Sequence, residues 1–393
     1  TIQTTTAGLI TLGAINAVDD TLLIDSAGGA DAVAGALVAA SLLLRGSGTF
    51  TLDEPANNVD TYAVDNITGA ATFVDVDGLS IATVDGVNGI TTSSDAVVNA
   101  GGTVDIDQPV DAGGIATVST TTGDINVNAT VDAVGRATLA TDAGDVDLDF
   151  AVTAAGVDLT AAAGLLDIDA PVAGGAQSMT FTSQTIDIAA NITGSDTITL
   201  QPDDNADGIG LAGGAGTFSL SQAEIDFLQD GFSGVLIGRA AVGAHAIDIH
   251  SVAFQDPVTI QAPANPGAIT VDGVITGADN ATVDLIGPDG TTTFTGANPG
   301  ISTHGNDITI ADAVVVDDGV LATLDTTANG NPAGANVTIT GDVRGVAADL
   351  PEETLIISAG TGGTADIQGA VGGAGGDEDL LLLITAGTLN IPQ

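Results

Sequence analysis

A short pattern of alternating apolar and polar residues recurs at a nearly constant spacing through residues 102–200. In each copy two apolar residues flank one polar residue, which predicts a short β-strand with one face toward a core. Successive copies are offset by 21, 21, 20 and 20 residues, at Val104/Ile106, Ile125/Val127, Val146/Leu148, Leu166/Ile168 and Ile186/Ile188. A strand that recurs at this period predicts a solenoid.

Two further apolar series run at the same spacing between the copies of the first. The second consists of Val110, Val131, Val152, Val172 and Ile192, and the third of Val118, Leu139, Leu159, Phe181 and Leu200. Gly, Asp, Asn and Ala separate them, and these small residues tolerate tight corners. Three short strands in each coil of ~20 residues predict a parallel β-helix with coils ~4.8 Å apart. The preference for right-handed crossovers predicts a right-handed helix.

The rest of the chain has a similar pattern with less regular spacing. Buried strands are expected at Leu9–Leu12, Leu22–Ile24 and Leu42–Leu44. An insertion at about 203–234 interrupts the coils, which resume over 235–393. Later strands are expected at Val235–Ile237, Ile247–Ile249, Ile269–Val271, Val283–Leu285, Ile308–Ile310, Val337–Ile339 and Leu355–Ile357. The composition does not shift along the chain, so one elongated all-β domain over 1–393 is predicted.

One short helix is expected within the insertion. Ser221 and Glu224 have the spacing of a capping box, in which each side chain bonds the backbone N–H of the other residue. Ile225 and Leu228 follow at helical spacing, and Gly231 lies where a helix would end. The pattern predicts a helix near 221–230.

The charge of the chain limits its partners. Four Lys and Arg against 51 Asp and Glu give a net charge of −47, and only five of the acids are Glu. Nucleic acids need clustered basic residues and are excluded, and anionic membranes are repelled. With 44% apolar residues the chain is expected to fold. There is no Cys, and no apolar stretch is long enough for direct insertion into a membrane.

One acidic corner has the spacing of a calcium loop. Asp203, Asn205 and Asp207 alternate before Gly208, as in the first half of a calcium-binding loop. The twelfth position is Gly214 and lacks the usual carboxylate. Two interpretations stay open, a calcium site and an ordinary Asp/Gly turn, and calcium is the one cofactor that the sequence indicates.

The sequence favours a protein without catalytic activity. It contains no Gly-x-Ser-x-Gly motif, in which a serine nucleophile would be exposed on a sharp turn. A carbohydrate-active β-helix enzyme is the main alternative. Lys and Trp are absent and Tyr62 is the single Tyr, so the basic and aromatic residues typical of such sugar-binding grooves are scarce.

Several segments resemble the filamentous-haemagglutinin-like family of secreted bacterial β-helix exoproteins. The segments are Leu42–Leu52, Val59–Thr92, Gly208–Leu228 and Gly231–Gly238. The resemblance implies an extracellular or cell-surface location, a role as an adhesin or fibre, and a cell-surface or matrix ligand. It implies no catalytic residues.

The ends of the chain suggest self-assembly. Gly387–Ile391 repeats the strand pattern, and solenoids need covered end coils because an open end exposes apolar core and unpaired backbone groups. Copies of the chain are therefore expected to join head to tail, through Leu389 and Ile391 of one copy and Ile2, Leu9 and Leu12 of the next. The alternative is that the chain is a segment of a longer, monomeric surface adhesin.

Overall fold

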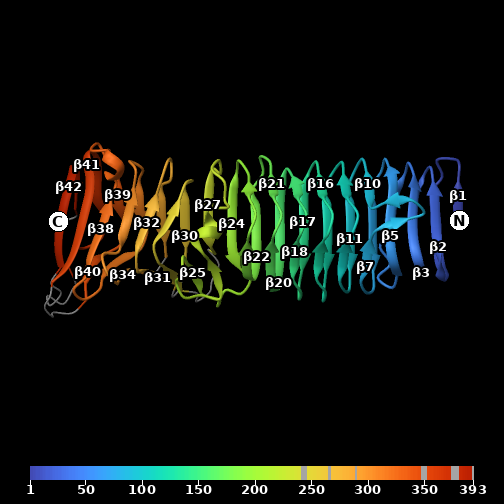
Figure 1. Ribbon diagram of the computed structural model, residues 1–393, viewed down its shortest axis with the longest axis horizontal. Helices are drawn as coiled ribbons and strands as arrows, with labels where there is room; N and C mark the ends of the chain where they lie inside the picture. Colours follow the sequence, from blue (N-terminus) through green and yellow to red (C-terminus); the bar gives the residue numbers. More distant parts are fainter. Residues whose placement is uncertain (240–245, 264–266, 288–289, 347–351, 373–379, 392–393) are drawn as a thin grey trace. The chain divides into compact units, whose positions relative to one another are not determined.

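The structure is a computed structural model that describes residues 1–239, 246–263, 267–287, 290–346, 352–372 and 380–391, without the side chains of 32–34. It consists of two compact units, Thr1–Ser195 and Asp196–Gln393. Each unit is all-β, and its successive coils are joined by parallel strand pairs, as the colour sequence in Figure 1 shows. The predicted parallel β-solenoid is therefore confirmed, whereas the right-handed sense of its coils stays a prediction.

In unit 1 three parallel ladders run through the regular coils. The first comprises β7 (Leu79–Ile81), β12 (Val104–Ile106), β15 (Ile125–Val127), β18 (Val146–Leu148) and the later parts of β20 (Gly156–Ile168) and β22 (Met179–Ile188). The second comprises β10 (Ile90–Thr92), β13 (Val110–Ala112), β16 (Val131–Ala133), β19 (Val152–Ala154), β21 (Val172–Gly174) and β23 (Ile192–Thr193). The third comprises β4 (Thr49–Leu52), β6 (Ala71–Asp75), β11 (Ala96–Ala100), β14 (Ala116–Thr120), β17 (Arg136–Thr141) and the earlier parts of β20 and β22.

The first coils of unit 1 contain longer strands and one hairpin. The long strands are β2 (Ile10–Ser26), β3 (Gly29–Gly46) and β5 (Asn58–Ile67), with the short β1 (Ile2–Thr4) paired to β2. The hairpin is formed by β8 (Thr83–Val84) and β9 (Val87–Asn88), which pair antiparallel. The expectation for Leu9 was wrong, because β2 begins at Ile10 and Leu9 is 57% exposed.

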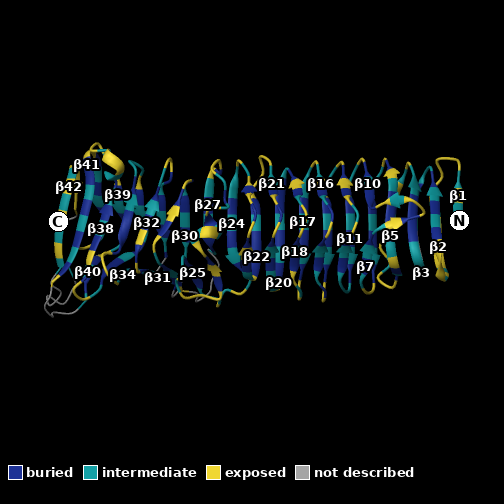
Figure 2. Cartoon of the chain, viewed as in Figure 1, coloured by how far each residue is buried: buried dark blue, intermediate teal, exposed yellow. Residues whose placement is uncertain are grey.

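The registers reproduce the repeat of the sequence. Val146 lies between Ile125 and Leu166 in the first ladder, and Leu159 pairs with Phe181 in the third. Val146, Leu148, Val152 and Leu159 are fully buried, as the repeat predicts. Figure 2 shows these buried strands alternating with exposed corners. Each fully buried Val or Leu contributes about 1.5–3 kcal/mol of apolar burial, so the columns of aligned side chains form the core.

Unit 2 also has three parallel ladders, with coils of less regular length. The first comprises β24 (Thr197–Pro202), β27 (Gly234–Gly238), β30 (Val258–Gln261), β33 (Val283–Ile286), β36 (Ile308–Ile310), β39 (Val337–Ile339) and the later parts of β41 (Glu353–Ile367) and β42 (Leu380–Asn390). The second comprises β26 (Phe218–Leu220), β25 (Ile209–Leu211), β28 (Ile247–Ile249), β31 (Ala268–Val271), β34 (Thr291–Phe294), β37 (Ala313–Val316) and β40 (Val343–Gly345). The third comprises β29 (Val252–Phe254), β32 (Val274–Gly277), β35 (Gly300–Thr303), β38 (Leu321–Asp325) and the earlier parts of β41 and β42.

The predicted helix is present but shorter than expected. It is α1 (Gln222–Ile225), and both hydrogen bonds of the predicted capping box between Ser221 and Glu224 form. The bonds from Phe227 N to Glu224 O and from Leu228 N to Ile225 O span only three residues, so the last turn tightens and the α-helix ends. The only other helical element among the described residues is η1 (Ala328–Gly330).

The buried column around Val146 generates the first prediction. Val146→Asp places a carboxylate without a partner in a fully buried position and should lower the free energy of unfolding by about 4 kcal/mol or more. Val134→Asp is the matched control, because Val134 is 75% exposed and should change stability by less than about 0.5 kcal/mol. Thermal unfolding followed by circular dichroism measures both. Equal stability of the two variants would contradict the placement of Val146 in the core.

Candidate functional site

The outward positions of the first ladder in unit 1 carry stacked acidic side chains. The polar residue at the centre of each strand points away from the core and pairs in register with its equivalents on the neighbouring coils. We call this column the acidic ladder; it consists of Asp105, Asn126, Asp147, Asp167 and Asp187. Its members repeat at the interstrand distance of ~4.8 Å.

A second column of acidic and amide side chains follows each of these strands. Asn128, Asp149 and Asp169 each donate a backbone N–H to the coil before them, at 3.0–3.2 Å. The two asparagines relieve the stacking of like charges. Asn126 donates its side-chain N–H to Asp105 at 2.7 Å, and Asn128 donates to Asp107 at 3.0 Å.

At two positions of the acidic ladder, Asp147 and Asp167, the pKa of the carboxyl group is raised. Partial burial is the main cause for Asp147, followed by the carboxylates of Asp149, Asp169 and Asp145. For Asp167 burial again comes first, followed by the neighbouring Asp169, Asp147, Asp187 and Asp149. Two unit charges 4 Å apart interact by about 1 kcal/mol in bulk water. The acidic ladder can therefore hold protons or a diffuse layer of cations.

Two residues of the predicted calcium site, Asp203 and Asn205, contact Arg239. The Arg239 guanidinium donates to the backbone carbonyl of Asp203 and, at 3.3 Å, to the side-chain oxygen of Asn205. Asp207 instead donates its backbone N–H to the carbonyl of Asp204 at 3.1 Å. The structure brings Asp203 and Asn205 together at a cationic group, so a calcium ion at Asn205 would compete with the guanidinium.

Among the described residues, no three or more His, Asp or Glu side chains are grouped so that they could hold a metal ion. The calcium assignment at Asp203, Asn205 and Asp207 stays a prediction. The acids of the acidic ladder lie in a line along the coils rather than around a point.

Helix α1 covers one edge of the third ladder in unit 2. The Gln222 side chain accepts from the Ala253 backbone N–H at 2.7 Å and donates to the Ala253 carbonyl at 3.1 Å. The amide thus bonds β29 as the peptide group of another strand would. The sequence analysis missed this residue, because Gln222 is also an ordinary helix-forming residue in the first turn.

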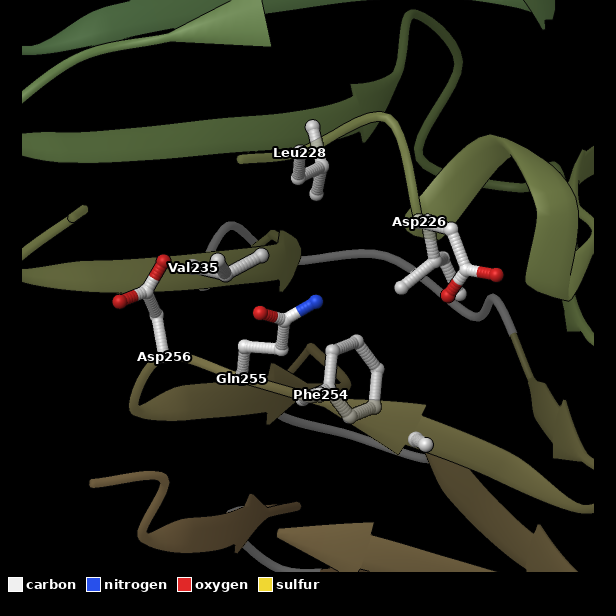
Figure 3. A pocket seen from close by; sticks show the side chains of 8 residues that line it. Asp226, Leu228, Val235, Phe254, Gln255 and Asp256 are labelled. Atoms are coloured by element: carbon white, nitrogen blue, oxygen red, sulfur yellow. The ribbon is translucent and has the colours of Figure 1, made fainter. Parts of the chain in front are cut away.

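A small cavity lies between α1 and β29, as Figure 3 shows. Its volume is about 10 Å³, which is the space of a single water molecule. At its edge Asp256 accepts from the backbone N–H groups of Gly231 and Phe232 at 3.1–3.3 Å. Burial raises the pKa of Asp256, which these two hydrogen bonds partly offset. The cavity is too small for an organic substrate, and the bonds of Asp256 hold the chain that follows the helix.

Buried carboxyl groups occur in both units. Burial raises the pKa of Asp75 in unit 1 to about 7 against opposing hydrogen bonds from the backbone, including Val59 N at 2.9 Å. Burial also raises the pKa of Asp312 in unit 2 to about 7, although the Thr292 hydroxyl donates to both of its oxygens at 2.9–3.0 Å. Both oxygens of the fully buried Glu353 lack a hydrogen-bond partner, as does the Tyr62 hydroxyl. The raised pKa values of Asp75 and Asp312 make stability sensitive to pH.

The residues predicted for self-assembly differ in exposure. Ile2 is half-buried in β1 and pairs with Ile24, whereas Leu12 is buried. Leu389 in β42 is 53% exposed, and Ile391 is 38% exposed. Ile2, Leu9 and Leu12 lie in unit 1, whereas Leu389 and Ile391 lie in unit 2.

Comparisons with known proteins give no relative: no family model, no curated protein and no solved structure matches the chain. In the part of the chain that the structure describes, no helix has the length and apolar character needed to cross a membrane.

The buried carboxyls generate a prediction for pH. Their pKa in the folded state lies above the ordinary value of about 3.9, so they stabilise the fold below pH 4 and lose this effect as pH rises toward 7. Asp312→Asn should flatten this dependence and raise stability at pH 8 by roughly 1–4 kcal/mol. Asp132→Asn, at an exposed position, removes the same charge and is the control. Equal pH profiles of both variants would contradict the role of Asp312.

The acidic ladder generates a prediction for salt. Asp147→Asn removes repulsion from neighbouring carboxylates. It also introduces at position 147 the residue type that its partner Asn126 has one coil earlier. The variant should melt at a higher temperature than the parent protein at low salt. The difference should shrink in about 1 M salt, where the screening length is ~3 Å. A difference that does not depend on salt would show that repulsion in the ladder is unimportant.

Proposed function

We propose that the chain is a structural, non-enzymatic β-solenoid that forms the shaft of an extracellular or cell-surface fibre or adhesin. The observation that carries the proposal is the register of the ladders. In each unit successive coils are bonded through three parallel ladders, and aligned apolar residues fill the core. Stretching such a unit along its coils loads many backbone hydrogen bonds together.

The surface chemistry supports this role. The outward positions of the acidic ladder carry short carboxylates and amides, which keep a repetitive β-structure soluble and discourage lateral strand pairing. The cavity beside α1 has the volume of a single water molecule, which is too small for a substrate. The resemblance to filamentous-haemagglutinin-like exoproteins points in the same direction and implies a cell-surface or matrix ligand.

Further copies of the chain are the partners that we propose for assembly. Leu382 and Ile384 of β42 are half-buried, whereas their partners Leu355 and Ile357 on β41 are almost fully buried. Among the described residues only β41 pairs with β42, and the opposite edge of β42 can receive another parallel strand, as in β-augmentation. We propose that the first coil of a neighbouring copy, near Ile2 and Leu9–Leu12, occupies this edge. Calcium at Asp203, Asn205 and Asp207, and cations along the acidic ladder, would reduce the repulsion between copies.

Electron microscopy with sedimentation tests the assembly. Ile391→Lys should prevent filament growth and leave the monomer folded, because a lysine at the edge of a sheet blocks pairing. Val134→Lys is the control, since it adds the same charge at a position that is 75% exposed. Growth should increase with salt and calcium. Asp207→Ala should remove the calcium effect and leave the salt effect.

Two results would contradict parts of this proposal. Monomers alone at high protein, salt and calcium concentrations would contradict head-to-tail assembly and favour a segment of a longer adhesin. Reproducible cleavage of a polysaccharide, abolished by one Asp substitution, would favour a carbohydrate-active enzyme.

A further inference from the structure

One outward face of unit 2 carries almost no charge, in contrast to the acidic ladder of unit 1. It is the outer surface of the third ladder, β29, β32, β35, β38, β41 and β42. One column of outward residues is Ala253, Thr276, Ser302, Asp325, Ser358 and Thr385. Its single carboxylate, Asp325, accepts from the Thr327 backbone at 2.8 Å and the Thr327 hydroxyl at 2.6 Å. We call this surface the acid-poor face.

The neighbouring outward columns of the same face are partly apolar. One runs through Val274, Gly300, Thr323, Ile356 and Leu383. The other runs through Leu321, Thr354 and Leu381. Leu321, Leu381 and Leu383 are 41%, 43% and 47% exposed, and Val274 is 36% exposed. These four residues lie on one face, and the residues between them in the two columns are Gly300, Thr323, Thr354 and Ile356.

Strand β42 has the composition of a strand that is covered on both faces. Residues 380–384 are all Leu or Ile, and Leu382 and Ile384 point inward while Leu381 and Leu383 point outward. A continuous apolar run is typical of strands buried on both sides, whereas strands with one solvated face alternate.

In unit 1 a column of outward apolar residues is covered by a hairpin. Leu23, Leu43 and Ala63 form an outward column in register on β2, β3 and β5. The β8–β9 hairpin packs against this column through Val84 and Val87, and Leu43 and Ala63 are fully buried. Among the described residues of unit 2, Leu381 and Leu383 have no such cover.

Two grooves lie on the part of the acid-poor face that is formed by β29, β32, β35 and β38. A groove of about 410 Å³ lies between Gln222 and Thr276, and a second of about 210 Å³ lies between Val274 and Thr323. Both have Val274 in their walls. A surface with grooves beside protruding leucines can interlock with a copy of itself when the two copies are related by a twofold axis.

We propose that the acid-poor face packs against the same face of a second copy, sheet on sheet. The partner must be compatible with the charge of the chain. With −47 on each copy, contact through the acidic ladder would bring a row of carboxylates opposite each other, whereas the acid-poor face brings Asp325 and, in the wall of its larger groove, Asp226. Two such faces pack ~10 Å apart in β-sandwiches. A neutral glycan fits less well, because no aromatic ring lies among the outward residues of this face.

The size of the face sets the strength of the contact. Six strands ~4.8 Å apart and five residues ~3.3 Å apart give a projected area of roughly 400 Å² per copy. The pair then buries on the order of 1,000 Å² of accessible surface, at the lower limit for specific interfaces. The dimer is expected to be weak and to strengthen with salt as repulsion between the rims is screened.

Sedimentation equilibrium of the full chain in about 1 M salt tests the proposal. Leu381→Asp/Leu383→Asp should weaken dimerisation at least tenfold. Val134→Asp/Phe150→Asp is the matched control, with 75% and 49% exposed positions in unit 1, and should have no effect. Circular dichroism verifies folding, and Leu383→Thr offers a neutral second variant. A parent protein that stays monomeric, or a dimer unaffected by the face variants, would overturn the proposal.

Cross-linking separates this dimer from head-to-tail growth. The chain has no Cys, so a Thr323→Cys variant places one thiol on the acid-poor face, and Thr138→Cys places one on an outward position of unit 1. A short bismaleimide should join copies of Thr323→Cys and not of Thr138→Cys. The joining should persist when Ile391→Lys is added. Equal joining of both variants, or protection of Thr323→Cys by a neutral oligosaccharide without dimers, would refute the second copy as occupant.

Discussion

The parallel, in-register hydrogen-bond ladder is the constraint on which the rest of the structure depends. In such a ladder each residue lies directly beside its equivalent on the next coil, as Val104, Ile125 and Val146 do. A residue type placed at one position therefore has its own kind as a neighbour in every coil. Apolar columns gain from this arrangement because they fill a narrow core. Charged columns lose from it, because like charges repeat at ~4.8 Å.

The acidic surface follows from the same constraint and has a cost. Aspartates face outward on a backbone that fixes their spacing, so repulsion cannot relax by moving the strands apart. The chain relieves the column with amides at Asn126 and Asn128, which bond the coil before them. Where the amides end, at Asp147 and Asp167, burial and neighbouring carboxylates raise the pKa values. Protons, salt and cations thus act on one quantity, the repulsion along the coils.

Much of the fold could be predicted from sequence, and the misses have physical causes. The regular spacing of residues 102–188 gave the registers, and the capping box gave the start of α1. The length of α1 could not be predicted from the sequence, because the tightening of its last turn depends on local backbone hydrogen bonds. In unit 2 aligned residues of the third ladder are 23, 26, 23, 33 and 27 positions apart, so no period shows which outward residues are neighbours. The acid-poor face could not be predicted for this reason.

The distribution of charge in unit 2 affects how readily copies of the chain associate. A strongly acidic surface keeps repetitive β-structure soluble, since exposed strand edges and apolar patches promote association. Leaving one face almost without carboxylates while exposing Leu321, Leu381 and Leu383 gives up that protection locally. In unit 1 the chain covers a comparable column with the β8–β9 hairpin, so such a surface is not tolerated by default. A copy that approaches the acidic ladder meets stacked carboxylates, so repulsion opposes lateral contact less at the acid-poor face than at that ladder.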